Sequence, residues 1–537
     1  MREQLEAWRT TWFGLLLAVL VCSACLPALR GGFIWDDDRH VSANAAVAAP
    51  DGLGRIWRVG GTPQYYPVTF SAFWLQYRIW DGRPEGFHAV NAALHACSAL
   101  LIYLLVLRLG FGGAALAALL FALHPVQMES VAWISELKNV LSTFFFLLAL
   151  LSWLEYEDRG GRRWYAATAA LYALALLSKT TTCVFPIVVV LLRWMRGRRV
   201  DAAFVKGLVP FFLLGAALGA HTIAVEAELE KAVGPEYELS ALQRLLLAGR
   251  AAWFYAGKLL VPVNLSFTYE RWSVDPAYPA HWLGAAGLAA AAWGLRRLKS
   301  RELAAAAGYY LLVLVPALGF FKIYPQRYSF VADHFQYLAC IGPFVAAGAL
   351  AARWTAHLER SNRALLLAFA AGALWIGSRA RAEVFQSEEA VWADAAAKQP
   401  GAYIAQLNLG KSLADQGRHG EAFKRYEAAL AIKPDLPEAH VNMGNILLTN
   451  GWFEPAVNHY RQALAGGARP AVVRSARNNM GVALARLQRW NEAAAVYRAA
   501  LAERPDDAEA RSNLCSVLAA KKDKAELKRS GCVAPGK

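Results

Sequence analysis

Charged side chains are scarce in this chain of 537 residues. Asp, Glu, Lys and Arg together make up 18% of it, whereas about a quarter is usual for a soluble globular protein. Hydrophobic residues reach 57%, with 19 Trp and 25 Phe. The scarcity is local, because apolar blocks follow one another up to about residue 377, and from Glu383 onward the chain is polar, Ala-rich and helical in pattern. The length has room for at least two domains, and the pattern predicts a membrane domain followed by a soluble one.

Acidic residues are the scarcer of the two charged classes. Their 41 side chains stand against 56 Lys and Arg, which leaves a formal net charge of +15. Such a charge can indicate nucleic-acid binding, but the sequence lacks the basic stripe that follows a phosphate backbone. The excess lies mostly in short loops between apolar runs, which is the positive-inside pattern of membrane proteins. The composition therefore argues against a nucleic-acid partner.

Cysteine is sparse as well, with seven in the chain. Only Cys515 and Cys532 lie in the polar part. In an oxidising compartment these two could pair and fasten the Lys-rich tail 521–529 onto the preceding helix; two free thiols are the alternative. The other five occupy apolar segments, where a cysteine is usually an inert small hydrophobe: Cys22, Cys25, Cys97, Cys183 and Cys340.

Eleven apolar blocks predict membrane-spanning helices, although several fall short of the roughly 20 residues of a full span. The first is interpreted as a retained helix rather than a cleaved signal, because an acidic, aromatic loop and ten further blocks follow it. An odd number of spans places the two ends of the membrane domain on opposite sides. The blocks lie near 12–29, 89–108, 111–123, 131–154, 164–177, 181–195, 204–222, 281–297, 304–321, 336–352 and 364–378.

The connecting loops predict the orientation. Four of them are rich in Lys and Arg and fall on one side, which is therefore cytoplasmic: they contain Arg159, Arg162 and Arg163; Arg193, Arg196, Arg198 and Arg199; Arg296, Arg297, Lys299 and Arg301; and Arg353, Arg360 and Arg363. The alternate loops are extracytoplasmic in this topology: 30–88, 124–130, 178–180, 223–280 and 322–335. Segment 239–261 is interpreted as an interfacial amphipathic helix, because three basic residues interrupt it.

The polar part of the chain contains an internal repeat. From Gly410 to Gly444 is 34 residues, the tetratricopeptide period, and from Gly444 to Gly481 is 37, because three residues are inserted around 466–470. Segment 383–400 resembles a partial leading repeat and 508–520 a polar capping helix. Small residues recur where two helices must approach closely, and the aligned copies are Gly410, Ala422, Tyr426, Ala429 and Pro434; Gly444, Ala456, Tyr460 and Ala463; and Gly481, Ala493, Tyr497, Ala500 and Pro505.

Three adjacent carboxylates, Asp36, Asp37 and Asp38, directly follow the first apolar block. Carboxylates are costly to place at a bilayer surface and therefore indicate function. A carboxylate can take the proton of an acceptor hydroxyl in group transfer, or can hold a divalent cation. A solvated helix end is the structural alternative.

Further polar clusters interrupt the apolar blocks on the same side of the membrane. A lone Lys in such a place is usually a snorkelling side chain, but several clusters on one membrane face favour a site. Cations there could hold a phosphate, and carboxylates could handle a hydroxyl proton. The residues are His124, Glu129, Lys138, Lys179, Arg327, Asp333 and His334.

The motifs in order are Phe33–Asp38 with Asn44; Tyr65-Tyr66-Pro67 with Gly86-Phe87-His88 and Asn91; His124-Pro125 through Glu129–Trp133; Leu177-Ser178-Lys179; Leu265-Ser266-Phe267; and Asp333–Leu338. This series resembles bacterial relatives of the transmembrane and tetratricopeptide-repeat protein O-mannosyltransferases over nearly the whole chain. The chain departs from the bacterial pattern at Thr180-Thr181, where Pro-Met is frequent, and at His334, where Arg is frequent.

The resemblance implies an all-α protein with a GT-C-like transmembrane helix bundle. It also implies a sugar donor linked to a polyprenyl phosphate, inversion at the anomeric carbon and an essential acidic residue in the first extracytoplasmic loop, where Asp36 and Asp37 match the family's acidic pair. The expected domains are 1–380, with about eleven membrane helices, and 383–537, the tetratricopeptide domain with its cap and tail.

The leading hypothesis is an integral glycosyltransferase of a bacterial inner membrane, with its repeats on the periplasmic side. Asp36 or Asp37 would act as the base or bind a divalent cation. Lys138, Lys179, Arg327 and His334 would bind the donor phosphate. Further active-site candidates are Asp38, His124, Glu129 and Asp333.

The acceptor would be a hydroxyl, on Ser or Thr of an extracytoplasmic protein or on a glycan. Asn side chains recur on the first helices of the repeats and could hydrogen-bond an extended peptide backbone as an acceptor groove: Asn408, Asn442, Asn445 and Asn478. A non-enzymatic membrane-anchored scaffold for envelope or polysaccharide assembly is the alternative. A polysaccharide ligase or flippase partner is a third hypothesis.

Overall fold

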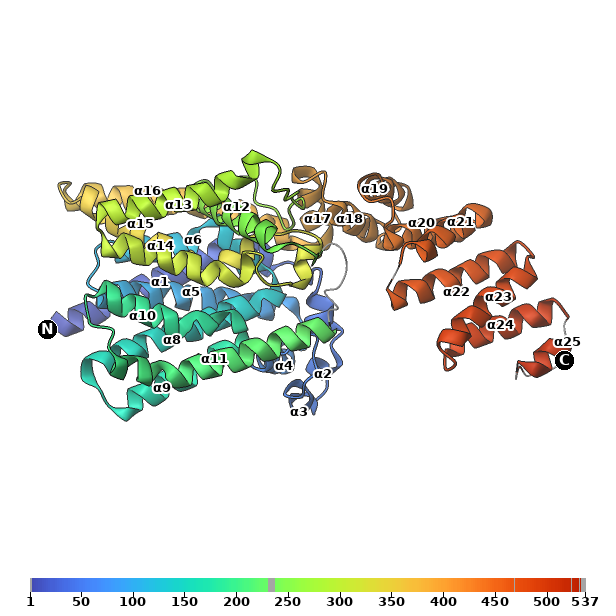
Figure 1. Ribbon diagram of the computed structural model, residues 1–537, viewed down its shortest axis with the longest axis horizontal. Helices are drawn as coiled ribbons and strands as arrows, with labels where there is room; N and C mark the ends of the chain where they lie inside the picture. The colour runs from blue at the N-terminus through green and yellow to red at the C-terminus, as the bar shows by residue number, and fades with distance from the viewer. Residues whose placement is uncertain (1, 230–236, 468, 523, 531, 533–537) are drawn as a thin grey trace. The chain divides into compact units, whose positions relative to one another are not determined.

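A computed structural model describes residues 2–229, 237–467, 469–522, 524–530 and 532 (Figure 1). The protein is 78% helical, and the described residues include no strand, which confirms the all-α prediction. The chain forms two compact units, Met1–Asp394 and Ala395–Lys537.

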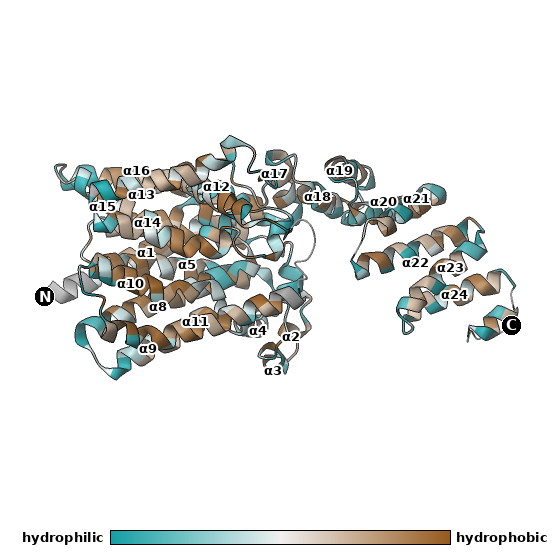
Figure 2. Ribbon diagram, viewed as in Figure 1, coloured by the Kyte–Doolittle hydropathy of each residue, from teal (hydrophilic) through white to brown (hydrophobic). Residues whose placement is uncertain are grey.

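The first unit is a bundle whose long helices are apolar over most of their length (Figure 2). Among the described residues, five helices are long and apolar enough to cross a membrane, or six if a bent pair counts as one span. The chain is thus a multi-pass membrane protein. These helices are α1 (Arg2–Leu29, apolar from Trp8), α5 (Pro84–Arg108), α8 (Leu137–Arg159), α11 (Ala202–Leu229) and α16 (Arg360–Glu383), and the bent pair is Ala114–Leu123 with Pro125–Ala132.

The other predicted spans form shorter helices, so within the described part of the chain fewer helices reach full spanning length than the eleven apolar blocks implied. Polar or Pro-containing breaks explain the difference. The chain leaves the helix at His124-Pro125, at Ser178–Val184 and at the short 3₁₀ turn Val315–Ala317. The shorter helices are α6 (Ala114–Leu123), α9 (Arg162–Ser178), α10 (Phe185–Met195), α13 (Leu283–Leu298), α14 (Arg301–Leu314) and α15 (Ile341–Trp354).

Close helix crossings hold the bundle together. Figure 1 shows α5, α8, α10 and α11 running side by side. Helix α6 begins after Gly113, whose φ of 77° lies in the left-handed region, and a Cβ at this position would come within 1.9 Å of the backbone oxygen of Gly348 on α15. A side chain at Gly113 would therefore force these two helices apart.

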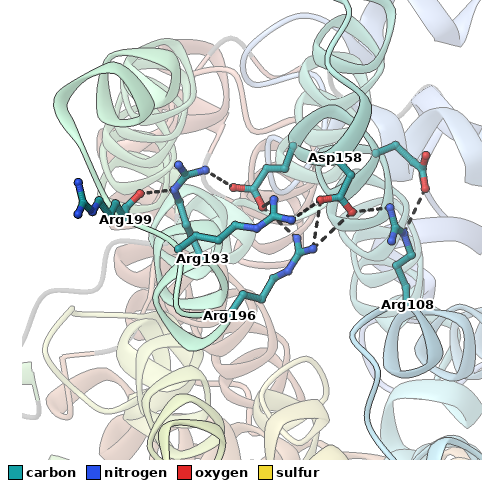
Figure 3. A network of polar contacts seen from close by, with 8 residues as sticks. Arg108, Asp158, Arg193, Arg196 and Arg199 are labelled. Atoms are coloured by element: carbon teal, nitrogen blue, oxygen red, sulfur yellow. Dashed lines mark hydrogen bonds and ion pairs between the residues drawn. The ribbon is translucent and has the colours of Figure 1, made fainter.

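One end of the bundle is tied by arginines and carboxylates (Figure 3). Arg108 at the end of α5 lies 2.6 Å from Asp158 at the end of α8, and Arg196 after α10 lies 3.1 Å from the same carboxylate. Arg193 pairs with Glu157 at 2.7 Å. Carboxylates at the C-terminus of a helix oppose its dipole, and the arginines offset this cost.

This basic network and the polar clusters lie at opposite ends of α8. The helix has 23 residues between Leu137 and Arg159, which is about 34 Å at the usual rise per residue. A bilayer's hydrocarbon core is about 30 Å thick. The Lys138 end and the Arg159 end are therefore a membrane thickness apart.

Short helices and turns form the end of the bundle near Lys138. Between α1 and α5 lie the π-helical turn η1 (Asp38–Ser42), α2 (Ala45–Ala48), α3 (Gly52–Ile56) and α4 (Pro67–Trp80). Later turns at this end are η2 (Pro125–Gln127), α7 (Met128–Ala132), η3 (Ile134–Glu136), η4 (Thr180–Val184), η8 (Tyr324–Arg327) and η9 (Asp333–Gln336). The segment predicted as interfacial is α12 (Ala241–Leu260), capped by Ser240 and Gln243. Residues 230–236 of the predicted loop 223–280 lie outside the described residues.

The second unit contains the three predicted repeats, each as a helical hairpin. They are α18 (Tyr403–Asp415) with α19 (His419–Ile432), α20 (Pro437–Thr449) with α21 (Phe453–Ala465), and α22 (Pro470–Arg486) with α23 (Trp490–Glu503), followed by α24 (Ala508–Ala520) and α25 (Lys524–Arg529). Helix α17 (Glu388–Lys398) occupies the predicted leading repeat and crosses the boundary between the units.

The recurring Gly and Tyr of the repeats have a steric basis. A Cβ on Gly444 would lie 2.6 Å from the ring of Tyr460, and a Cβ on Gly481 would lie 2.4 Å from the ring of Tyr497. The glycine on the first helix of each hairpin thus makes room for the buried Tyr of the second. This contact accounts for the common spacing of the two residues.

Cys515 and Cys532 form a disulfide, with their Cα atoms 5.6 Å apart. The bond joins α24 to the chain beyond α25. The structure therefore supports the pairing rather than two free thiols. The five cysteines of the first unit are free.

Candidate active site

The three adjacent carboxylates differ in their surroundings. Asp37 is fully buried, Asp36 is half-buried and Asp38 is exposed. One oxygen of Asp37 accepts a hydrogen bond from the backbone N–H of Ile34 at 2.9 Å. Its other oxygen accepts from the N–H and the hydroxyl of Ser135, at 2.8 and 2.6 Å. Asp37 therefore fastens the first loop to the turn before α8, and Asp36 beside it retains access to solvent.

Burial controls the protonation of this loop. It raises the pKa of Asp37 to about 7, although the hydrogen bonds from Ile34 and Ser135 act in the opposite direction. Burial and the nearby Lys138 ammonium lower the pKa of His40 to about 3, so its imidazole is neutral near pH 7. His40 Nδ1 lies 2.9 Å from the carbonyl oxygen of Asp36 and 3.2 Å from the Ser135 hydroxyl.

Asp37 is poorly suited to hold a divalent cation. Both of its oxygens accept N–H or O–H donors, and these donors point hydrogens to where a cation would bind. Among the described residues, no group of three or more His, Cys, Asp or Glu side chains is arranged to hold a metal ion.

Lys138 and Lys179 meet on one carboxylate. The Nζ of Lys138 lies 2.9 Å from one oxygen of Glu136, and the Nζ of Lys179 lies 3.5 Å from the other. Each Lys side chain is 12% exposed and that of Glu136 is 1% exposed. Lys179 also donates to the side-chain oxygen of Asn139 at 2.6 Å. The predicted site residues include both lysines but neither Glu136 nor Asn139, which lie with Lys138 in the polar segment Ser135–Asn139.

Two further carboxylates, those of Glu129 and Asp333, lie beside this cluster. His334 Nδ1 is 2.5 Å from Glu129 Oε1, and its Nε2 is 3.9 Å from Glu136. The hydroxyl of Tyr269 donates to the buried Asp333 at 2.8 Å. Burial and the neighbouring Glu129 raise the pKa of Asp333. The structure thus joins Glu129 and His334 to Glu136 and the lysines. Tyr269 is not among the predicted site residues.

Two other predicted residues make local contacts. The ring of His124 accepts from the N–H of Val126 at 3.3 Å and lies 3.1 Å from the carbonyl oxygen of Leu259, so it caps η2. Arg327 ends η8, and its guanidinium lies 5.9 Å from the ring centre of Tyr328. Phosphate binding by Arg327 stays a prediction.

Two of the predicted acceptor asparagines, Asn445 and Asn478, contact the helices that follow their own hairpins. Asn445 accepts hydrogen bonds from Tyr460 at 2.8 Å and from Asn479 at 2.7 Å. Asn478 accepts from Asn513 at 2.7 Å, and its amide donates to Glu509 at 2.6 Å. Asn445 and the half-buried Asn442 stand on α20 and Asn478 stands on α22, the first helices of their hairpins.

Asn408 requires a correction. It is 6% exposed, and its amide donates to the carbonyl oxygen of Ile404 within α18. Its side chain therefore does not face an open groove. The spacing of the asparagines along the helices predicted only approximately which helix face they occupy. Packing between the helices determines which of their side chains are buried.

Comparison with known families locates the resemblance. The profile of the family described as "Dolichyl-phosphate-mannose-protein mannosyltransferase" matches residues 63–220, a range that includes Glu136, Lys138 and Lys179. Two tetratricopeptide profiles match residues 410–451 and 441–526.

Curated relatives extend the match. The Caenorhabditis elegans "Protein O-mannosyl-transferase F38B6.6" is 24% identical over 83% of this chain and 62% of its own length. The Drosophila melanogaster "Protein O-mannosyl-transferase Tmtc2" is 30% identical over 47% of this chain and 29% of its own. The human "Protein O-mannosyl-transferase TMTC4" is 29% identical over 31% and 27%. The chain thus spans less than two thirds of the length of these relatives. These matches show that the chain is similar to the TMTC family of protein O-mannosyl-transferases and, in its second unit, to tetratricopeptide repeats.

Proposed function

We propose that this protein is an integral membrane glycosyltransferase that moves a sugar from a polyprenyl-phosphate donor to a hydroxyl, on Ser or Thr of an extracytoplasmic protein. One observation carries the proposal. The turn Ile134–Glu136 holds the acidic loop through Ser135 and both lysines through the next residue, Glu136. A carboxylate-bearing loop and a pair of cations are thereby fastened to one short turn.

The reaction needs a base and a means of neutralising the leaving group. The acceptor oxygen attacks the anomeric carbon as the bond from that carbon to the phosphate oxygen breaks, which inverts the centre. The hydroxyl proton goes to the carboxylate of Asp36, and the electron pair of the broken bond stays on the phosphate oxygen. The ammonium groups of Lys138 and Lys179 neutralise the charge that develops there.

Asp36 is the better candidate for the base. Asp37 is fully buried and accepts three hydrogen bonds from the protein, so its role is to hold the loop. Asp38 is exposed and accepts from the N–H of Arg39. Asp36 is half-buried, so its carboxylate is partly desolvated and can still contact an acceptor hydroxyl.

The site end of the bundle faces the extracytoplasmic side in this proposal, because the arginine network marks the opposite end as cytoplasmic. The disulfide in the second unit suits an oxidising compartment. The repeats bind the acceptor polypeptide. The same arrangement in a bacterium would place the protein in the inner membrane with its repeats in the periplasm.

Transfer assays in nanodiscs test the proposal. Polyprenyl-phosphate-linked sugars and a Ser/Thr-rich peptide are incubated with the full chain, and the peptide is analysed by mass spectrometry. Asp36→Asn is expected to lower kcat about 10²-fold or more, because general-base catalysis contributes on this order. Asp38→Asn is the matched control and is expected to retain activity. A wild-type protein that transfers no sugar from any such donor would favour the scaffold hypothesis.

A further inference from the structure

Glu136 touches both lysines and is almost completely covered. It ends the turn η3, Lys138 lies in the first turn of α8, and Lys179 follows the last residue of α9. The two oxygens of Glu136 are divided between the two ammonium groups, at 2.9 and 3.5 Å. A single buried carboxylate thus determines where two flexible side chains place their charges.

Other charged and titratable groups surround this carboxylate. His334 from η9 lies 3.9 Å from Glu136 and pairs with Glu129 from α7. His40 from the first loop is influenced by the charges of Lys138 and Glu136. Asn139 holds Lys179 independently of Glu136 and also donates to the carbonyl oxygen of His334 at 3.0 Å. Lys179 therefore keeps one anchor if Glu136 loses its charge.

We propose that Glu136 is a positioning residue that sets Lys138 and Lys179 for the departing phosphate and weakens the hold of the site on the phosphate product. This inference rests on the proposed function. Lysine has a long flexible stem and binds as a point charge, so its contribution to the transition state depends on being held in place. The carboxylate supplies that hold without touching the substrate.

The charges predict that loss of the Glu136 carboxylate slows turnover but strengthens binding of the phosphate product. The three side chains Lys138, Lys179 and Glu136 leave one positive charge in excess, which matches the single negative charge of a phosphodiester donor. The product is a phosphate monoester with a charge of about −1.5 to −2 near pH 7. The carboxylate opposes the additional negative charge and so favours release of the product.

The test compares Glu136→Gln with the wild type and with Glu85→Gln, an exposed carboxylate in the first turn of α5. In nanodiscs, Glu136→Gln is expected to lower kcat about tenfold or more, because the cations are no longer held. The KM for the donor is expected not to rise. The affinity for polyprenyl phosphate is expected to increase about threefold or more, because an opposing charge is lost. Glu85→Gln is expected to match the wild type in all three quantities.

The variant Glu136→Asp distinguishes the effect of the negative charge from the effect of side-chain length. It keeps the negative charge with a side chain shorter by one methylene, so the affinity for polyprenyl phosphate is expected to stay near the wild-type value while kcat falls. If Glu136→Gln does not fold, this variant decides the question. Loss of both kcat and product affinity in Glu136→Gln would indicate a merely structural ion pair, and unchanged values would remove any positioning role.

Binding of polyprenyl phosphate separates this inference from the proposed reaction. If the wild type binds polyprenyl phosphate and Glu136→Gln binds it more tightly, but neither transfers sugar, the anion site stands and the proposed transfer fails. If the wild type transfers sugar and Glu136→Gln behaves like it, the inference fails alone. If the wild type neither binds nor transfers, both are overturned.

Discussion

Ser135 donates both its backbone N–H and its hydroxyl to one oxygen of Asp37, a residue 98 positions earlier in the chain. This pair joins the first loop to the turn before α8. Because the next residue, Glu136, holds Lys138 and Lys179, the acidic loop and the cations depend on the same three-residue turn. A change at Ser135 or Asp37 should therefore affect both halves of the site.

Substitution of Asp37 tests this connection. In Asp37→Asn the amide presents an N–H group to donors that need an acceptor, and leaving a buried donor unsatisfied costs about 1–3 kcal/mol. Ser135→Ala removes only the hydroxyl donor and is expected to cost about 1 kcal/mol. Thermal unfolding of the full chain in detergent should rank the two variants in this order. Asp38→Asn, on the exposed carboxylate, should unfold like the wild type. Equal midpoints for Asp37→Asn and Asp38→Asn would contradict the anchoring role.

Because the buried imidazole of His40 has a lowered pKa, we expect the free energy of unfolding to depend on pH. Its folded-state pKa of about 3 lies below the ordinary value of 6.5, so on acidification the unfolded chain takes up the proton first. The contribution of the neutral imidazole to stability is therefore present above pH 6.5 and is lost progressively as the pH falls from 6.5 towards 3. Unfolding midpoints measured across this range should fall less steeply in His40→Gln than in the wild type. Identical slopes would mean that His40 is not held neutral by burial.

The disulfide predicts a specific labelling result. With the chain denatured and without reductant, a thiol reagent should add to the five free cysteines of the first unit. With reductant it should add to all seven. Intact mass measurement reads the difference directly. Because the bridge spans 17 residues, replacing both cysteines by Ser is expected to cost the repeats about 3 kcal/mol. Seven additions without reductant would show that the bridge does not form.

The proposed acceptor groove predicts a separation of two activities. Asn442→Ala combined with Asn478→Ala should weaken transfer to a long peptide about fivefold or more, because two hydrogen bonds to the peptide of about 0.5–1.5 kcal/mol each are lost, and should spare transfer to a small soluble acceptor. Asn458→Ala, on the exposed face of α21, is the matched control. If both acceptors were affected equally, the repeats would serve another partner.

Local patterns in the sequence determined the architecture. Long apolar blocks predict membrane helices because a lipid-facing helix must be apolar over its whole length. The period of Gly410, Gly444 and Gly481 predicts the hairpins because each glycine must accommodate a tyrosine of its own repeat. Both signals depend on residues close together in the chain, so they can be recognised in the sequence without the tertiary structure. The apolar blocks did not predict helix lengths, because breaks such as His124-Pro125 and Ser178–Val184 end helices within the bundle.

Only the tertiary structure decided the roles within the candidate site. Asp36, Asp37 and Asp38 are adjacent residues of the same type. Asp37 alone of the three is fully buried, and it accepts hydrogen bonds from the distant Ser135. Lys179 meets Glu136 across 43 positions, and His334 meets Glu129 across 205. Asn408 resembles its counterparts in the other repeats, yet packing covers it. Burial and pairing depend on segments far apart in the chain, and a carboxylate's chemistry follows from those neighbours rather than from its own position.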